Sequence, residues 1–196
     1  MTDEHAIIRA LSSSIQTYNS YFQHILGADT GGGWKKSNKD HYCFIPTRNV
    51  EDIVRVLHYI RTLDTGRNRS RNKFLDCGCG IGNIMMLAGK VGFGPYGIEY
   101  EKENVELARK LLRNTIISSK QVIHGDIMEY KYYNQYDVIY YYEPLRDHKK
   151  QRQFADKIAK DAKRGAFVIP NGEWGSRKSE WEHIKYIGAL GIYKKL

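Results

Sequence analysis

The chain has 196 residues, a length typical of one domain rather than two. Hydrophobic residues make up 41% and charged residues 27%, which excludes wholesale disorder and a collagen-like repeat. The net charge of +9 favours anionic partners such as RNA, DNA or acidic protein surfaces, although a basic surface without a specific partner explains it equally well. The N-terminus lacks the pattern of a signal peptide, and no apolar run approaches the roughly 20 residues of a membrane span. We therefore expect a cytoplasmic protein that does not enter a membrane.

Two helices are predicted before residue 72. Residues 5–26 carry apolar side chains at alternating three- and four-residue steps, and residues 50–63 carry a second apolar stripe. Between them, residues 27–40 are rich in glycine and polar residues, which predicts a loop. We expect residues 1–71 to form a helical cover with a lid segment and residues 72–196 to form the core, together in one compact domain.

From residue 73 onward, strands and helices alternate. The pattern predicts strands at 73–77, 95–100, 121–124, 136–142 and 166–170, helices at 84–90, 103–115 and 147–163, and a closing hairpin at 181–195. Repeated units of this length predict a doubly wound α/β fold with a mostly parallel seven-stranded sheet, helices on both faces and an N-terminal helical extension.

A glycine-rich turn follows the first of these strands. Gly78, Gly80 and Gly82 allow the backbone to turn sharply and a ligand to approach closely. Glu99 ends the next strand, 21 residues after Gly78. In doubly wound sheets a carboxylate at that place accepts hydrogen bonds from a ribose, so the two features together predict an adenosine-containing ligand.

The residues around the turn narrow the choice of ligand. A dinucleotide site of the G-x-G-x-x-G type requires glycine where Asn83 stands, which disfavours a nicotinamide-dependent oxidoreductase. Asp76 would repel a pyrophosphate but suits a ligand with an ammonium group. No Gly-Lys-Ser/Thr sequence follows, which excludes a P-loop.

Four motifs in chain order resemble those of class I S-adenosylmethionine-dependent methyltransferases. They are DCGCGIGN at 76–83, GIEYEKENVELARKLL at 97–112, HGDIMEY at 124–130 and YDVIYYYEPL at 136–145, with GAFVIPN at 165–171 similar to the fifth strand. Four correctly spaced motifs are far more specific than one glycine loop. The resemblance covers about residues 72–172 and implies S-adenosylmethionine as the cofactor.

The resemblance also implies a role for each motif. The first motif lines the methionine end of the cofactor, Glu99 holds the ribose hydroxyls, and Asp126 accepts from the adenine amino group, unless Asp126 merely caps a turn. The expected cofactor site comprises Asp76, Gly78, Cys79, Gly80, Gly82, Asn83, Glu99, Tyr100, Asp126, Ile127, Glu143 and Pro144. Glu143 and Tyr142 are the expected catalytic residues, with Glu143 accepting a proton, orienting an amine or holding the cofactor ammonium, unless it is a strand-end residue that makes only a backbone bond.

The two cysteines of the glycine loop are most simply explained by packing. Cys77 and Cys79 are separated by one residue, so on an extended backbone their side chains point to similar sides. A small, soft side chain packs well at such a place, and we expect a structural role rather than metal binding. No metal site is expected.

The methyl acceptor is the open question. Amino-group methyltransferases of nucleobases and glutamine resemble one another in an Asp/Asn-Pro-Pro-aromatic sequence, and the run at 143–146, Glu-Pro-Leu-Arg, departs from it. Residues 43–57, CFIPTRNVEDIVRVL, are similar to a Pro-Thr segment of some protein lysine methyltransferases. We therefore expect a macromolecular acceptor, with protein lysine slightly ahead of RNA. A small-molecule methyltransferase and a non-catalytic accessory protein that binds S-adenosylmethionine or nucleic acid are the alternatives.

Basic residues follow the fourth strand, on the side of the sheet where ligands bind. They are Arg146, His148, Lys149, Lys150 and Arg152. A rim of this kind suits an acidic or phosphorylated protein or an RNA substrate. The oligomeric state cannot be inferred from the sequence.

Overall fold

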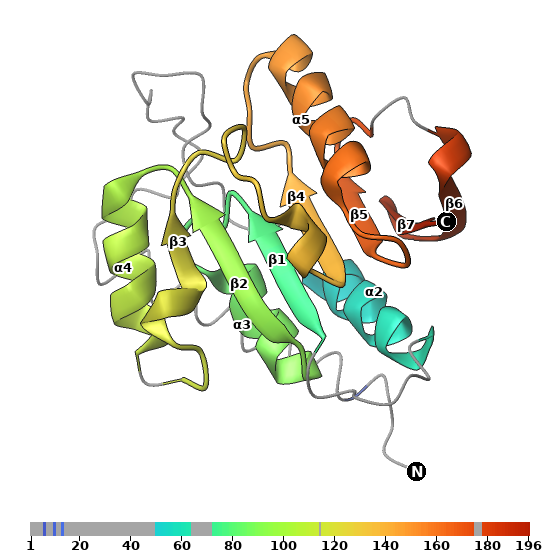
Figure 1. The fold of residues 1–196 in the computed structure, drawn as a ribbon. Helices are drawn as coiled ribbons and strands as arrows, with labels where there is room; N and C mark the ends of the chain where they lie inside the picture. Colours follow the sequence, from blue (N-terminus) through green and yellow to red (C-terminus); the bar gives the residue numbers. More distant parts are fainter. Residues whose placement is uncertain are drawn as a thin grey trace.

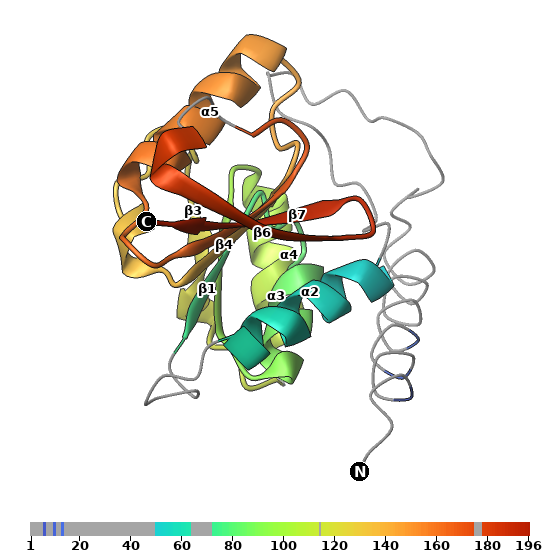
Figure 2. The ribbon, with the colours of Figure 1, turned by 90° about the vertical axis from the view of Figure 1, so that its right-hand side faces the viewer.

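The computed structural model describes residues 6, 10 and 13, 50–63, 72–113, 115–174 and 178–196. These residues form a seven-stranded sheet with helices on both faces (Figure 1 and Figure 2). The predicted helix at 5–26 falls outside the described residues apart from Ala6, Ala10 and Ser13, which are helical. The predicted loop at 27–40 lies wholly outside them.

The strands follow the order β3-β2-β1-β4-β5-β7-β6 across the sheet. β7 runs antiparallel to both of its neighbours, and the other pairs are parallel. The strands are β1 (Lys73–Cys77), β2 (Gly94–Glu99), β3 (Val122–His124), β4 (Val138–Tyr142), β5 (Phe167–Asn171), β6 (Trp181–Ile187) and β7 (Leu190–Lys195). The strand order reverses between β1 and β4, and in open α/β sheets a ligand crevice forms at the carboxyl ends beside such a reversal.

Helices cover the two faces of the sheet unequally. The described α-helices are α2 (Val50–Leu63), α3 (Asn83–Val91), α4 (Lys102–Leu112) and α5 (His148–Asp161), and three short 3-10 helices are η2 (Ser119–Gln121), η3 (Tyr133–Gln135) and η4 (Lys178–Glu180). Figure 2 shows α2 and α3 below the sheet and α5 above it. Among the described helices, none combines the length and apolar character that crossing a membrane requires.

Each face of the sheet has its own apolar core, as expected when helices cover both sides. On one face, Leu57 of α2 packs in a buried cluster that includes Phe74 of β1. On the other face, Phe154 and Ile158 of α5 pack in a buried cluster that includes Ile139 of β4. The carboxyl edge of the sheet is therefore supported by a packed apolar layer on each face.

The predicted fold class is confirmed, and the predicted strands and helices from residue 50 onward are all present. Their ends differ by a few residues for local reasons. β4 begins at Val138 because the side chain of Asp137 accepts the backbone N–H of Lys73 at 2.7 Å and pairs with Lys163, which fixes a polar turn before the strand. α4 ends at Leu112, whose carbonyl accepts the Thr115 hydroxyl at 2.7 Å.

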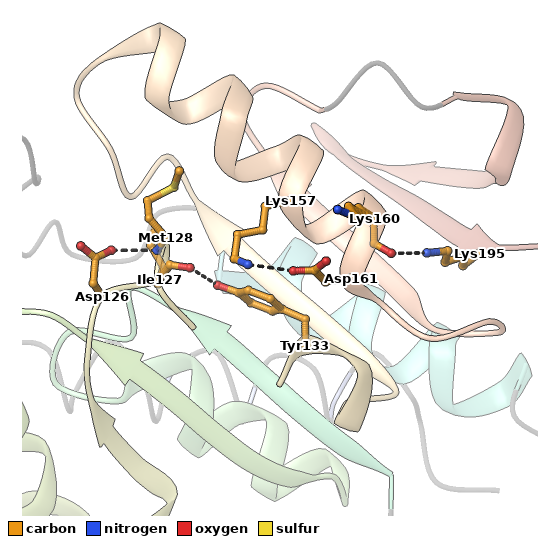
Figure 3. Close-up of polar contacts among 8 residues, drawn as sticks. All are labelled: Asp126, Ile127, Met128, Tyr133, Lys157, Lys160, Asp161 and Lys195. Atoms are coloured by element: carbon orange, nitrogen blue, oxygen red, sulfur yellow. Dashed lines mark hydrogen bonds and ion pairs between the residues drawn. The ribbon is translucent and has the colours of Figure 1, made fainter. Parts of the chain in front are cut away.

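Lys195 anchors the end of α5, and its loss is expected to lower stability. Its ammonium donates to the carbonyl oxygens of Ala159, Lys160 and Ala162 at 2.8–2.9 Å, and Figure 3 shows the bond to Lys160. A cation at a helix C-terminus satisfies orphan carbonyls and opposes the helix dipole. We expect Lys195→Met to cost about 1–2 kcal/mol of unfolding free energy and to lower Tm by roughly 2–8 °C in a thermal melt.

Lys194→Met is the matched control for that melt. The Lys194 side chain is exposed and only approaches the Phe167 ring, 5.7 Å from its centroid. An equal loss of Tm in both variants would show that the ammonium of Lys195 does not stabilise α5.

Candidate cofactor site and active site

The predicted site residues gather at the carboxyl ends of β1, β2 and β4. β1 lies between the other two strands, so the turns after all three meet at one edge of the sheet. Asp76 lies at the end of β1, Glu99 ends β2, and Glu143 follows β4. Topology alone brings these three carboxylates to one edge.

The glycine turn after β1 packs closely against the loop after β4. Gly78 has a φ of +84°, and its N–H and that of Cys79 both donate to the Ile98 carbonyl at 2.9 Å. A Cβ at Gly78 would lie 3.1 Å from the Cβ of Pro144. A side chain at this position would therefore be strained and would crowd the loop that carries Glu143.

Glu99 is held in a fixed orientation by the backbone of both neighbouring turns. One carboxylate oxygen, Oε2, accepts from the Gly80 N–H, and Oε1 accepts from the Glu101 N–H, each at 2.8 Å. Burial raises the pKa of this carboxyl, while these bonds and one from the Asn104 side chain oppose the rise. Of the roughly four acceptor sites of a carboxylate, these three bonds leave one for a ribose hydroxyl, and exchange of the Asn104 bond would provide a second.

Asp76 is a buried acid with little to balance its charge. Its side chain is 3% exposed, and desolvation, followed by the nearby charge of Glu99, raises its pKa from 3.8 to about 8. A cation beside the carboxyl would favour the ionised form. The ammonium of an amino-acid-like ligand would supply that cation.

Asp126 and Ile127 form a tight turn after β3, drawn in Figure 3. Asp126 Oδ1 accepts the Met128 N–H at 2.7 Å, and the Ile127 carbonyl accepts the Tyr133 hydroxyl at 2.6 Å. The carboxylate thus caps the turn, which is the structural alternative stated above for Asp126. Because the bond from Met128 uses one of the two carboxylate oxygens, the geometry also fits acceptance from an adenine amino group.

Glu143 has the most unusual backbone of the site. Among the described residues it is the one non-glycine residue with positive φ, +34°. Its N–H donates to the Asn171 carbonyl at 3.1 Å, its side chain is exposed, and a Cβ on Gly172 would lie 2.4 Å from its Cγ. Strain of this kind concentrates at functional sites. The neighbouring Tyr142, the other expected catalytic residue, is half-buried against the α2 side of the sheet.

The remaining predicted cofactor residues lie in and around the glycine turn. Gly80 and Gly82 are buried in the turn, Asn83 is the buried first residue of α3, and Tyr100 is half-buried after β2. One expectation was wrong: the two cysteine side chains do not share a side. Cys77 packs in the cluster under α5 and Cys79 in the cluster with α4, because the left-handed turn at Gly78 separates them.

Sequence reasoning missed Gln151, which supports the loop after β4. Its amide Oε1 accepts the Leu145 N–H at 3.2 Å, and its side chain is 3% exposed. The signal was available, since residue 151 precedes the apolar residues 154, 155 and 158 at helical spacing. A polar residue in such a buried row indicates a hydrogen-bonding role.

The predicted basic rim forms the start of α5. Lys149, Lys150 and Arg152 are exposed on its first turns, and Arg146 lies half-buried in the preceding loop. The Arg152 Nε donates to Glu173 Oε1 at 2.7 Å, which ties α5 to the segment after β5. Among the residues that the structure describes, no cluster of three potential metal ligands is present.

Together these groups fit S-adenosylmethionine. Asp76 suits its ammonium, Glu99 suits its ribose hydroxyls, and the turn at Asp126 and Ile127 suits its adenine. These individual roles stay predictions.

Comparison with known proteins identifies the family. A family model described as a methyltransferase domain matches residues 68–184, more than half of the chain. No curated protein matches the sequence.

Solved structures show the same fold at low sequence identity. An RNA methyltransferase from Salinibacter ruber, solved with S-adenosyl-L-homocysteine, has a TM-score of 0.53 at 20% identity, covering 77% of this chain and 92% of that one. TehB from Haemophilus influenzae has a TM-score of 0.56 at 13% identity, covering 78% and 64%. The mitomycin 7-O-methyltransferase MmcR has a TM-score of 0.53 at 15% identity, covering 73% of this chain, which spans only 54% of MmcR.

These neighbours support the fold, whereas the family model covers the motifs of the site. The chain belongs to the methyltransferase domain family and is a class I methyltransferase that depends on S-adenosylmethionine.

Proposed function

We propose that this chain methylates an acceptor group of an RNA, with Glu143 beside the acceptor. The observation that carries the proposal is the exposed Glu143 carboxylate, held in a left-handed backbone where the carboxyl ends of β4 and β5 meet. S-adenosylmethionine supplies the activated methyl group when bound. Asp76, Glu99 and the Asp126 turn would hold it, which leaves Glu143 to accept a proton from the acceptor or orient it.

Two observations put RNA ahead of protein lysine. The segment similar to lysine methyltransferases, 43–57, is described only from Val50, and its apolar residues there are buried in the core as part of α2. By contrast, the basic start of α5 lies at the carboxyl edge of the sheet and is exposed. A fold neighbour that is matched over 92% of its own length is an RNA methyltransferase, which supports the same choice.

Transfer of tritiated methyl groups to fractionated RNA, protein and metabolite pools tests this function. We expect label in RNA, and Glu143→Ala to lower kcat about 10²-fold or more, within the range for loss of a general base. The affinity for S-adenosylhomocysteine should change little, because Glu143 acts on the acceptor.

Glu182→Ala is the matched control, since Glu182 is an exposed glutamate of β6. Label in protein alone would assign the acceptor to lysine or another side chain, and label in metabolites alone would assign it to a small molecule. Either result would overturn the RNA proposal. Unchanged turnover in Glu143→Ala would remove Glu143 from the chemistry.

A further inference from the structure

The β6–β7 hairpin and the segment that follows β5 carry aromatic side chains that the cofactor site does not use. Trp174, His183, Tyr186 and Tyr193 form a continuous row, here called the aromatic face. Ring centroids lie 5.4 Å apart for Trp174 and Tyr193, 5.2 Å for Tyr193 and His183, and 4.3 Å for His183 and Tyr186. Trp174 and Tyr193 pack against the cluster under α5, so the row lies on the α5 side of the sheet.

An irregularity in β6 creates this row. The pairing register shifts between His183 and Lys185, so Ile184 and Lys185 both face the α2 side. Tyr186 therefore returns to the same side as His183, where strict alternation would have placed it on the opposite side. The bulge thus collects the aromatic residues on one face.

Gly191 lets the two tyrosine rings lie flat over the backbone. It stands opposite Tyr186, and a Cβ there would lie 2.8 Å from Tyr193 Cε2 and 3.2 Å from Tyr186 Cε1. The two hydroxyl oxygens are 3.2 Å apart. The rings are therefore pre-ordered before any partner arrives.

The aromatic face is open to solvent at His183 and Tyr186 and half-buried at Trp174 and Tyr193. Tyr186 is 59% exposed and His183 is also exposed. The segment that connects β5 to β6 contains, in its described part, only the short helix η4, which has three residues. A parallel crossover usually carries a helix that would cover such a face.

Positive charge adjoins the row. Glu173, directly before Trp174, pairs with Arg152 of α5, so the first turns of α5 lead onto the aromatic face. Lys149 and Lys150 lie exposed one turn earlier. Glu182, the acidic residue of β6, pairs with Lys194 of β7. It directly precedes His183, so its side chain faces the α2 side of the sheet, away from the aromatic face.

We propose that the aromatic face stacks unpaired bases of a single-stranded RNA, while Lys149, Lys150 and Arg152 contact its phosphates. Aromatic platforms beside a basic track are the recurring way in which proteins bind single strands. The inference rests on the proposed RNA methylation and deepens it, since it assigns the surface that delivers the acceptor to the edge with Glu143.

Fluorescence anisotropy with a labelled, unstructured RNA of about 12 nucleotides tests the surface without requiring turnover. We expect the double variant His183→Ala/Tyr186→Ala to raise Kd at least tenfold, since each stacked base depends strongly on its ring. The double variant Lys149→Ala/Lys150→Ala should reduce the slope of log Kd against log salt by about 1.4. Both variants should bind S-adenosylhomocysteine like the wild type.

Tyr132→Ala is the matched control, because Tyr132 is 56% exposed and lies before β4, away from the hairpin. It should leave the RNA Kd unchanged. Failure of the wild-type protein to bind the RNA at about 50 mM salt, or equal affinity in the His183/Tyr186 variant, would overturn the proposal. A dimer in light scattering that Tyr186→Ala dissociates would assign the face to a second copy of the chain instead.

Methyl transfer separates this proposal from the function on which it rests. RNA labelling whose kcat/KM is unchanged in the His183/Tyr186 variant would refute the docking surface and leave the proposed function standing. Labelling confined to protein would refute the proposed function.

Discussion

Asp76→Asn is expected to make the protein more stable at pH 8 and a weaker binder of its cofactor. Burial, followed by the nearby charge of Glu99, raises the pKa of Asp76 from its ordinary value of 3.8 to about 8 in the folded protein. As pH rises from about 4 to about 8, the unfolded chain has lost this proton and the folded chain retains it, so wild-type stability falls across this range and is constant above it. The variant lacks this loss, and we expect a gain of about 1–3 kcal/mol at pH 8 that vanishes near pH 4, measured by urea unfolding.

The same substitution removes the acid that faces the cofactor ammonium. We expect S-adenosylmethionine and S-adenosylhomocysteine, which share that ammonium, to bind about 10- to 100-fold more weakly, in line with the loss of one charge-assisted contact. Wild-type binding at pH 7 should also release a proton, visible as a dependence of the calorimetric enthalpy on the buffer, and the variant should not. The exposed Glu103→Gln is the control. A variant less stable than wild type at pH 8, with unchanged affinity, would show that Asp76 is an ordinary ionised structural acid.

Glu99→Ala is expected to weaken the binding of S-adenosylhomocysteine about 100-fold or more. The carboxylate would lose two hydrogen bonds to the ribose, and hydrogen bonds to charged groups contribute about 1.5–3 kcal/mol each. The variant also leaves the Gly80 and Glu101 N–H groups without their acceptor, so the turn itself loosens. Isothermal titration calorimetry gives the affinity directly.

Binding of ligand fragments distinguishes two causes of weaker binding in Glu99→Ala: loss of the contact to the ribose and collapse of the whole site. Adenosine should lose affinity for Glu99→Ala as strongly as the whole cofactor does, whereas a fragment without the ribose should not. Glu99→Gln, which keeps one acceptor oxygen, should lose less than the alanine variant. Equal binding of adenosine by wild type and Glu99→Ala would contradict the assignment of Glu99 to the ribose.

The sequence predicted the parts of this molecule that depend on local pattern. Period-two and period-3.6 runs gave the strands and helices, and the topology of a doubly wound sheet then brought Asp76, Glu99 and Glu143 to one edge. It did not predict features set by contacts between distant segments. The close approach of Pro144 to Gly78 and the hydrogen bond from the Glu143 N–H to the Asn171 carbonyl join residues that only folding brings together.

The aromatic face could not be predicted from the sequence for a different reason. A β-bulge shifts the alternation of side chains by one residue, and the residues at 183–186 do not reveal it. The cysteine pair was misjudged for a related reason, since a single left-handed glycine ended the extended geometry on which the expectation depended.

The insertion of β7 between β5 and β6 has a consequence for synthesis on the ribosome. β6 leaves the ribosome before the strand that separates it from β5, so the apolar β5 spends that interval as an open sheet edge. Open edges of this kind invite pairing with other chains. Pro170 lies in β5 beyond the two residues that β7 pairs, Phe167 and Val168, and has no N–H to donate. The proline therefore makes part of this edge unable to donate a hydrogen bond to another chain until β7 arrives. No hydrogen bond is lost in the folded sheet, because β7 does not pair with Pro170.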